Sequence, residues 1–220
     1  MKHTLLMRFA APMQSWGTRS RFDERDSELE PSKSGVIGLI CAAQGIDRSE
    51  TKPVIELAKL RMGVRVDKEG TLQRDYHTAK DIVRADGKGI QRTAVSNRYF
   101  LSDAIFLVGL EGENKEYLEK LNTALKNPYY PLFFGRKSFV PSQPIFLKNA
   151  VVDNDLKNAL TEYPFLGIET PKRLVIESKS KSGALRMDQP ISSFVERKFG
   201  ARFVEMESYS SAYEAKNVPF

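Results

Sequence analysis

The sequence contains few of the residues that build covalent or metal-held scaffolds. Its 220 residues include one cysteine, Cys41, and two histidines that lie far apart, His3 and His77. A single cysteine excludes an internal disulfide, and this set of ligands is too small for a structural zinc site. Cys41 falls within an apolar helical pattern, where thiols are usually inert, so a cysteine nucleophile is also disfavoured. We expect no metal site and no cofactor.

Long hydrophobic runs are missing as well. The longest apolar run, residues 35–43, has about half the length that a membrane span needs. The start of the chain lacks the features of a signal peptide, and no Asn-x-Ser/Thr acceptor occurs. With 41% hydrophobic and 28% charged residues, the composition excludes disorder, collagen and coiled coil for the whole chain. These features predict a globular cytoplasmic protein.

Charge is present in excess of one sign and is clustered. Lysine and arginine total 34 against 28 acidic residues, a net charge of +6. Residues 70–102 carry six basic and three acidic side chains, and residues 171–202 carry eight basic and three acidic ones. The two windows together exceed the net charge of the whole chain. Clustering of this kind favours a polyanionic partner.

The hydrophobic pattern predicts an α+β fold. Apolar runs and helix signals indicate strands at 3–9, 62–66, 72–77, 104–108 and 144–147, and helices at about 33–45, 52–60, 113–126 and 155–163. Residues 78–97 are polar and basic, which predicts a projecting loop or hairpin. The order strand–helix–strand, insertion, strand–helix–strand is that of a ferredoxin-like (RRM-like) βαββαβ domain. We expect this domain at 1–148 and a smaller, mostly β part at 149–220.

The turn Gly135-Arg136-Lys137-Ser138 invites comparison with a phosphate-binding loop. The Walker pattern fails, because it needs glycine where Arg136 and Tyr130 stand. A glycine turn that presents two cations and a hydroxyl can still hold a phosphate through its backbone amides and charge. A tight turn with solvated charges explains the same residues equally well.

Trp16, followed by Arg19 and Arg21, offers an aromatic ring beside cations, a combination that suits stacking of an unpaired base. The alternative is that Trp16 is a core residue, as a lone tryptophan more often is. The acidic residues that follow, between positions 23 and 30, match no calcium loop, and Arg25 lies among them. They are interpreted as a solvated loop.

The sequence Tyr76-His77, followed by Lys80, contains the residue types that metal-free RNA cleavage requires. Histidine would act as the general base on a 2′-hydroxyl, and lysine or tyrosine would stabilise the developing charge. RNA contact or simple packing is the alternative for the same three residues, because the other histidine, His3, lies in the first strand and offers no evident acid partner.

Several segments occur together in a familiar order. They agree at five places, which are residues 11–17, residues 31–39, residues 63–67 leading to 75–78, residues 99–104 and residues 131–138. Over residues 3–148 the chain resembles the CasD family, the subunit that holds the 5′ end of the guide RNA in type I-E CRISPR Cascade complexes. Ordered agreement at five places is far more specific than any single motif.

This resemblance implies a fold of the repeat-associated RNA-binding superfamily, with a basic β-hairpin thumb at about 78–97. It further implies a non-catalytic subunit that caps the 5′ handle of the crRNA. The partners would be a CasC-type backbone subunit, a CasA-type large subunit and, through the complex, target DNA. The thumb residues expected to face these partners are Lys80, Arg84, Lys88 and Arg92. Relatives of another subtype cleave RNA, so a metal-independent endoribonuclease acting on repeat RNA is the alternative, and a basic protein-interaction module is a third reading.

The residues expected to bind RNA form two groups. Phosphate contacts are predicted for Lys33, Ser34 and Gly35 and for Gly135, Arg136, Lys137 and Ser138. Contacts with the bases or backbone of the handle are predicted for Trp16, Arg19, Arg21, His77, Arg98 and Tyr99. Cations for phosphates and planar faces for stacking are what a protein that holds a fixed RNA end requires.

Overall fold

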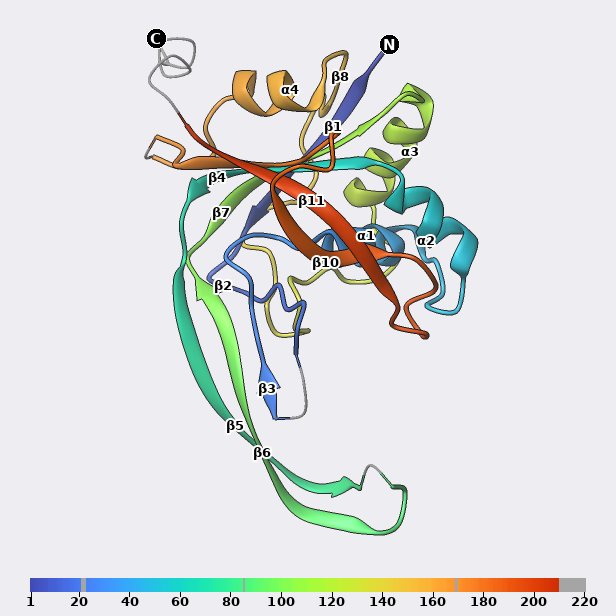
Figure 1. The fold of residues 1–220 in the computed structure, drawn as a ribbon, viewed down its shortest axis with the longest axis vertical. Coiled ribbons are helices and arrows are strands. Elements are labelled where there is room, and N and C mark those ends of the chain that lie inside the picture. Colours follow the sequence, from blue (N-terminus) through green and yellow to red (C-terminus); the bar gives the residue numbers. More distant parts are fainter. Residues whose placement is uncertain (21–22, 85, 169, 210–220) are drawn as a thin grey trace.

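The computed structural model describes residues 1–20, 23–84, 86–168 and 170–209. Within them the chain is an α+β protein built on a seven-stranded sheet with the strand order β10-β11-β9-β4-β7-β1-β8. All neighbouring strands in this sheet pair antiparallel. A long two-stranded hairpin leaves the sheet and extends away from the body of the molecule (Figure 1). The expected fold class, α+β, is confirmed.

Three central strands form the middle of the core. They are β1 (His3–Ala10), β4 (Arg61–Lys68) and β7 (Ile105–Gly112), and most of their residues are buried on both faces. Helix α4 (Leu156–Glu162) packs on one face, where an added Cβ at the register partners Gly63 and Gly109 would meet Leu156. Two glycines side by side therefore let this helix approach the sheet closely.

The opposite face is covered by α1 (Lys33–Gln44), α2 (Thr51–Ala58) and α3 (Lys115–Lys126). Helix α1 begins where Ser32 Oγ accepts a hydrogen bond from the Gly35 amide, and it ends at Gly45 with φ +73°. Asn114 and Asp155 cap α3 and α4 in the same way as Ser32 caps α1. All four predicted helices are confirmed, with bounds that differ by at most two residues.

The projecting hairpin, called the arm below, consists of β5 (Thr71–Val83) and β6 (Ile90–Ser102). Its strands pair from Thr71 with Ser102 to Val83 with Ile90. The projection was expected only for residues 78–97. It begins earlier, because the strand predicted at 72–77 continues along the arm and all of its residues are exposed. Two short strands, β2 (Met13–Gln14) and β3 (Glu24–Arg25), pair with the C-terminal part of β6, toward the base of the arm.

The C-terminal strands extend the same sheet. Strands β9 (Arg173–Glu177), β10 (Ala184–Pro190) and β11 (Phe199–Ser208) continue from the edge of β4. At the other edge, β1 pairs with the short strand β8 (Val151–Val152). The strand predicted at 144–147 is wrong. There an irregular segment bonds to β1 through the carbonyl groups of Ile145 and Ala150.

One buried ion pair links α4 to the sheet. Arg65 is fully buried and donates two hydrogen bonds to Asp67, of 2.6 and 2.8 Å. Its remaining donors reach the carbonyl groups of Leu160, Tyr163 and Pro164. An arginine can be buried in this way because its planar fork satisfies several acceptors at once.

Among the described residues, no helix is long and apolar enough to cross a membrane.

Candidate RNA interface

The arm presents two different faces. Side chains alternate along a strand, so Arg74, Tyr76 and Lys80 share one face of β5, while Asp75 and His77 lie on the other. Cross-strand partners follow the same rule, which places Tyr99 beside Arg74 and Arg98 beside Asp75. Because the arm stands away from the body (Figure 1), both faces are open to a partner.

Most of the cations on the arm are available for a partner. Across the part of the chain that the structure describes, Arg74, Lys80, Lys88 and Arg92 make no ion pair. Arg84 makes one weak contact, 3.5 Å from Asp86. An extended ribbon with unpaired cations lowers the free energy of a bound polyanion along its length. The charge cluster seen in the sequence at 70–102 is therefore a cationic surface.

A tight turn, Gly135–Ser138, lies at the base of the arm. Gly135 adopts φ +88°, and the turn is closed by hydrogen bonds from the Phe139 amide to Arg136 O and from the Phe134 amide to Phe139 O, of 2.9 and 2.8 Å. Lys137 and Ser138 are exposed. The turn therefore presents a cation and a hydroxyl beside the arm, and phosphate contact by Lys137 and Ser138 stays a prediction.

Arg136 ties this turn to the arm. Its Nη2 donates a 3.0 Å hydrogen bond to Tyr99 O, and its Nη1 lies 3.6 Å from Asp75 Oδ2. The guanidinium also covers the rings of Phe139 and Phe100, at 4.8 and 5.8 Å from their centroids. Burial lowers the pKa of Arg136, and the charge of Arg98 lowers it further, while Asp75 opposes both effects. Arg136 thus fixes the base of the arm and remains partly accessible.

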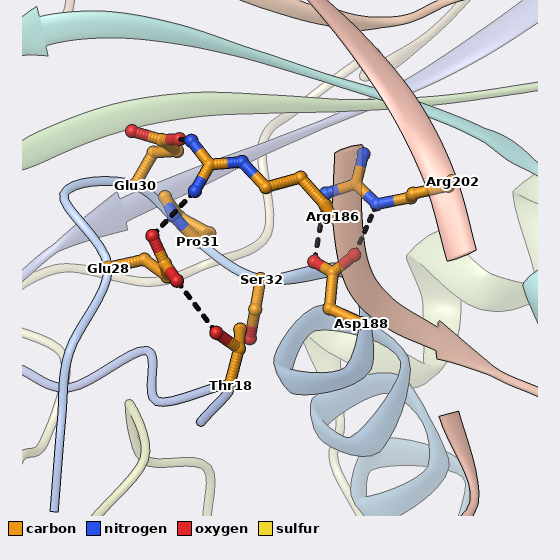
Figure 2. Close-up of a pocket in the computed structure, with 8 residues that line it drawn as sticks. All are labelled: Thr18, Glu28, Glu30, Pro31, Ser32, Arg186, Asp188 and Arg202. Atoms are coloured by element: carbon orange, nitrogen blue, oxygen red, sulfur yellow. Dashed lines mark hydrogen bonds and ion pairs between the residues drawn. The ribbon is translucent and has the colours of Figure 1, made fainter. Parts of the chain in front are cut away.

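Part of the second basic window, residues 171–202, is neutralised by ion pairs inside the protein. Arg186 binds Glu28 and Glu30, each at 2.6 Å, and Arg202 binds Asp188 at 2.6 Å (Figure 2). Arg173 adds a 3.0 Å ion pair to Glu30. The contacts of Arg186 and Arg173 attach the strap, defined here as residues 15–20 and 23–32, to strands β10 and β9, and the Arg202 pair joins β11 to β10. Three of the eight cations that suggested a polyanion partner are thus structural.

Phosphate contact by the Lys33 side chain is wrong. Lys33 is almost fully buried, its Nζ binds Glu177 Oε2 at 2.8 Å, and its amide donates to Asp188 Oδ2. Burial lowers the pKa of Lys33, and Glu177 opposes this effect. Ser34 and Gly35 are half-buried at the start of α1, where the Gly35 amide is already bonded to Ser32 Oγ. For these two residues phosphate contact stays a prediction.

A stacking platform at Trp16 is also wrong. The indole is 2% exposed and packs between Phe9 and Phe134, with ring centroids 5.5 and 5.6 Å away. A Cβ at Gly35 would collide with it, so α1 also presses on this ring. The alternative reading of Trp16 as a core residue is confirmed. Arg19 remains exposed and lies 3.5 Å from Glu28, and Arg21 lies outside the described residues.

The constellation suggested for RNA cleavage does not form. Tyr76 and His77 are neighbours on one strand, so their side chains point to opposite faces, and Lys80 shares the face of Tyr76. A general base must lie within hydrogen-bond reach of the group that it serves together with its charge-stabilising partner. His77 is left on the face of Asp75 and Arg98, where contact with RNA stays a prediction.

Cys41 is buried in α1, and burial raises the pKa of its thiol to about 12. An inert thiol, as the sequence predicts, matches this environment. Among the described residues, no group of three or more histidine, cysteine or acidic side chains is placed to hold a metal ion.

Two residues of this candidate interface are not predicted by the sequence pattern. Arg74 belongs to the basic window without an assigned role, and Arg25 falls in the acidic stretch that is interpreted as a solvated loop. In the structure Arg25 belongs to β3 and lies beside Arg98 in β6. A basic residue inside an acidic run was the available signal, but its neighbour comes from a distant part of the chain.

Comparison with known proteins places this architecture among CRISPR-associated proteins. The family model described as CRISPR-associated protein (Cas_Cas5) matches residues 4–205. "CRISPR system Cascade subunit CasD" from Escherichia coli (strain K12) is 31% identical over 180 residues, covering 76% of this chain and 80% of that protein.

Two solved structures are similar over nearly the whole chain. One, described as "Crystal structure of Cas protein", is 48% identical with a TM-score of 0.78, and the match covers 96% of both chains. The other, a chain of a "CRISPR RNA-guided surveillance complex", is 29% identical with a TM-score of 0.78, covering 93% of this chain and 89% of that one.

Proposed function

The chain belongs to the Cas5 family of CRISPR-associated proteins, and we propose that it is a non-catalytic subunit of a Cascade-type surveillance complex that binds the 5′ handle of the guide RNA. The observation that carries this proposal is the arm, a ribbon open on both faces whose cations are mostly unpaired within the described residues. A two-stranded ribbon without a core of its own has little stability where it stands apart from the body. A partner that covers the ribbon would stabilise it.

The handle would lie at the base of the arm. Lys137 and Ser138 supply a charge and a hydroxyl for phosphates, and Arg98, His77 and the edge near Tyr99 lie on the adjoining ribbon. Single-stranded RNA is held through phosphates and through bases that are stacked or hydrogen-bonded individually. A rigid turn beside an open ribbon offers both kinds of contact within a short distance.

The fold supports the same assignment. The four strands β4-β7-β1-β8, with α1 and α3 on one face, follow the strand order of a ferredoxin-like βαββαβ unit, and the arm is inserted between β4 and β7. RNA-recognition domains use this arrangement. The sheet continues through β9, β11 and β10, which form most of the smaller C-terminal part proposed at 149–220.

The outer arm would contact partner subunits. Lys80, Arg84, Lys88 and Arg92 lie far from the turn at 135–138, toward the tip (Figure 1). We assign them to the interface with a CasC-type backbone subunit and the guide. A CasA-type large subunit would dock at the handle end, and target DNA would reach the protein through the assembled complex in the cytoplasm. Target sequence is then selected by guide pairing, so the chain needs no helix that reads a DNA groove.

The test measures retention of labelled repeat RNA by the purified full chain at moderate salt. Lys137→Glu is expected to weaken retention about tenfold or more, since it replaces a charge-assisted phosphate contact with repulsion. Lys52→Glu is the matched control, because Lys52 is an exposed lysine on α2, away from the arm.

Scrambling the 5′-handle sequence completes the experiment. Weaker retention of the scrambled RNA supports a handle-binding subunit, whereas equal retention of both RNAs with a steep salt dependence indicates a general polyanion binder and contradicts the proposal. Equal effects of Lys137→Glu and Lys52→Glu would contradict the assigned site.

A further inference from the structure

Three arginines gather on one face at the base of the arm. Arg25 in β3 and Arg98 in β6 are parallel register partners, so their side chains are direct neighbours on strands about 4.8 Å apart. On its other side Arg98 is the register partner of Asp75 in β5. Arg136 reaches the same face from the turn, with its Nη1 3.6 Å from Asp75 Oδ2. Two strands and one turn thus bring three guanidinium groups to the face of Asp75.

Carboxylates do not balance this charge. Among the described residues of β3, β5 and β6, Asp75 is the one carboxylate beside Arg98 on this face, and Arg136 shares it. Arg98 Nε donates instead to Ser96 Oγ at 2.9 Å. Within the described ranges neither Arg25 nor Arg98 forms an ion pair. The charge of Arg98 is felt by Arg136, whose pKa is lowered first by burial and then by this neighbour.

Such an arrangement is unfavourable in the free protein. Like charges at directly opposed positions of a sheet repel, and opposite charges are the stabilising choice there. At the adjacent register pair, on the other face, the charge of Glu24 is instead met by a hydrogen bond, because Asn97 Nδ2 donates to Glu24 Oε1 at 2.8 Å. A bound anion would convert the repulsion into charge-assisted hydrogen bonds, since each guanidinium presents several donors.

We infer that Arg25, Arg98 and Arg136 form a binding site for one backbone phosphate of the guide RNA. This inference rests on the proposed function and specifies where the strand passes. An RNA strand that runs from Lys137 and Ser138 to the arm crosses this face. Its regularly spaced phosphates can contact the turn and the three arginines in succession, which a single acidic side chain of a partner protein cannot do. His77, two residues from Asp75 on the same face, lies beside the site.

The first experiment measures the affinity of the full chain for repeat RNA as a function of salt. Arg25→Gln is expected to lower the affinity about tenfold, as for the loss of one hydrogen-bonded charge. The slope of log K against log salt should fall in magnitude by about 0.7, the value for one phosphate contact on a single strand. Arg48→Gln, at an exposed arginine between α1 and α2, should change neither quantity.

The second experiment uses the free protein and does not involve RNA. Arg25→Gln removes one of two adjacent like charges, so the unfolding temperature at low salt is expected to rise, and the rise should shrink in high salt. A purely structural arginine predicts the opposite sign. An unfolding temperature that falls on substitution would therefore overturn the inference, even if RNA affinity also fell.

The outcomes separate the two proposals. If wild-type protein retains no repeat RNA, the proposed function fails. If wild-type protein binds and Arg25→Gln leaves affinity and salt slope unchanged, only the phosphate site is refuted. If the substitution weakens association with partner subunits but not RNA binding, the anion is an acidic protein surface and the inference is likewise overturned.

Discussion

Gly135 lies directly against Ser15: a Cβ added to Gly135 would overlap the carbonyl oxygen of Ser15. The contact joins the turn at the base of the arm to the segment that follows β2. The Ser15 amide donates to Phe134 O at 3.1 Å, and Ser15 Oγ donates to Tyr99 O, the same oxygen that Arg136 reaches. The turn, the strap and the arm therefore meet at one point.

Gly135→Ala is expected to destabilise the protein and to weaken RNA retention. The residue combines φ +88° with backbone on which a methyl group would collide. The left-handed conformation alone costs an alanine about 1–2 kcal/mol, and displacement of Ser15 adds to this. The free energy of unfolding, measured with denaturant, checks the prediction.

Gly87→Ala is the matched control for this substitution. Gly87 also has positive φ, +70°, but nothing lies within 4 Å of its Cβ position. It should show the conformational cost alone and leave retention at the base of the arm intact. Equal losses of stability for the two variants would show that the contact between Gly135 and Ser15 has no energetic weight.

Arg186→Gln is expected to loosen the strap. Arg186 binds Glu28 and Glu30 at 2.6 Å each, and both partners are largely buried. Breaking such a contact leaves two carboxylates less well compensated, although Arg173 still serves Glu30, so we expect a loss of about 2 kcal/mol. Hydrogen exchange of the Thr18 and Glu28 amides, which bond within the strap, should accelerate.

The control is Lys198→Gln, which removes an exposed ion pair with Glu196. Exposed pairs contribute about 0.2–1 kcal/mol, so stability should change little and exchange in the strap should be unaffected. Unchanged exchange of the strap amides in Arg186→Gln would show that the strap is held by other contacts.

Repeat RNA is expected to remain intact when incubated with the purified chain in chelator at neutral pH. Tyr76 and Lys80 lie on the face opposite His77, so no pair of them with His77 can serve one 2′-hydroxyl. Gel analysis of labelled RNA provides the measurement. Cleavage that disappears in His77→Ala and persists in Thr78→Ala would contradict the non-catalytic assignment.

The buried thiol of Cys41 is expected to lower the free energy of unfolding as the pH rises above 9. Its ordinary pKa is 9.0, and burial raises it to about 12 in the folded chain. Above pH 9 the unfolded chain releases the thiol proton while the folded chain retains it, so rising pH favours unfolding, by up to about 1.4 kcal/mol per pH unit. Below pH 9 the contribution is constant.

The comparison variant is Cys41→Ala, in which this part of the pH dependence between about 9 and 12 should be absent. Denaturant unfolding at several alkaline pH values measures the difference in slope. Parallel curves for wild type and variant would mean that the thiol ionises while the protein is folded.

The sequence predicted what depends on neighbours close in the chain. The helix at about 33–45 and the strands at 62–66 and 104–108 depend on local features, and α1, β4 and β7 are found where the sequence predicts them. The same holds for the projecting segment, whose lack of apolar residues left it no core to join. Its start was misplaced because alternation alone does not show where a strand leaves a sheet.

Features that depend on distant pairing were missed. The local sequence predicts an exposed cation at Lys33, where a helix begins. Its partners, Glu177 and Asp188, come from strands that no local pattern connects to it. Arg25 reads as one charge among acids, but β6 places it beside Arg98. Trp16 lies in a polar stretch of sequence and is yet in the core, because Phe134, which is distant in sequence, packs against it.

The pairing of Lys33 with Glu177 has a consequence for how the chain is made. The carboxylate is synthesised 144 residues after the ammonium group that it neutralises. Until then the first turn of α1 cannot be buried without an uncompensated charge. Contacts of this sequence separation also slow folding. Neutralisation of Lys33 in a growing chain therefore requires β9, which carries Glu177, to have been synthesised.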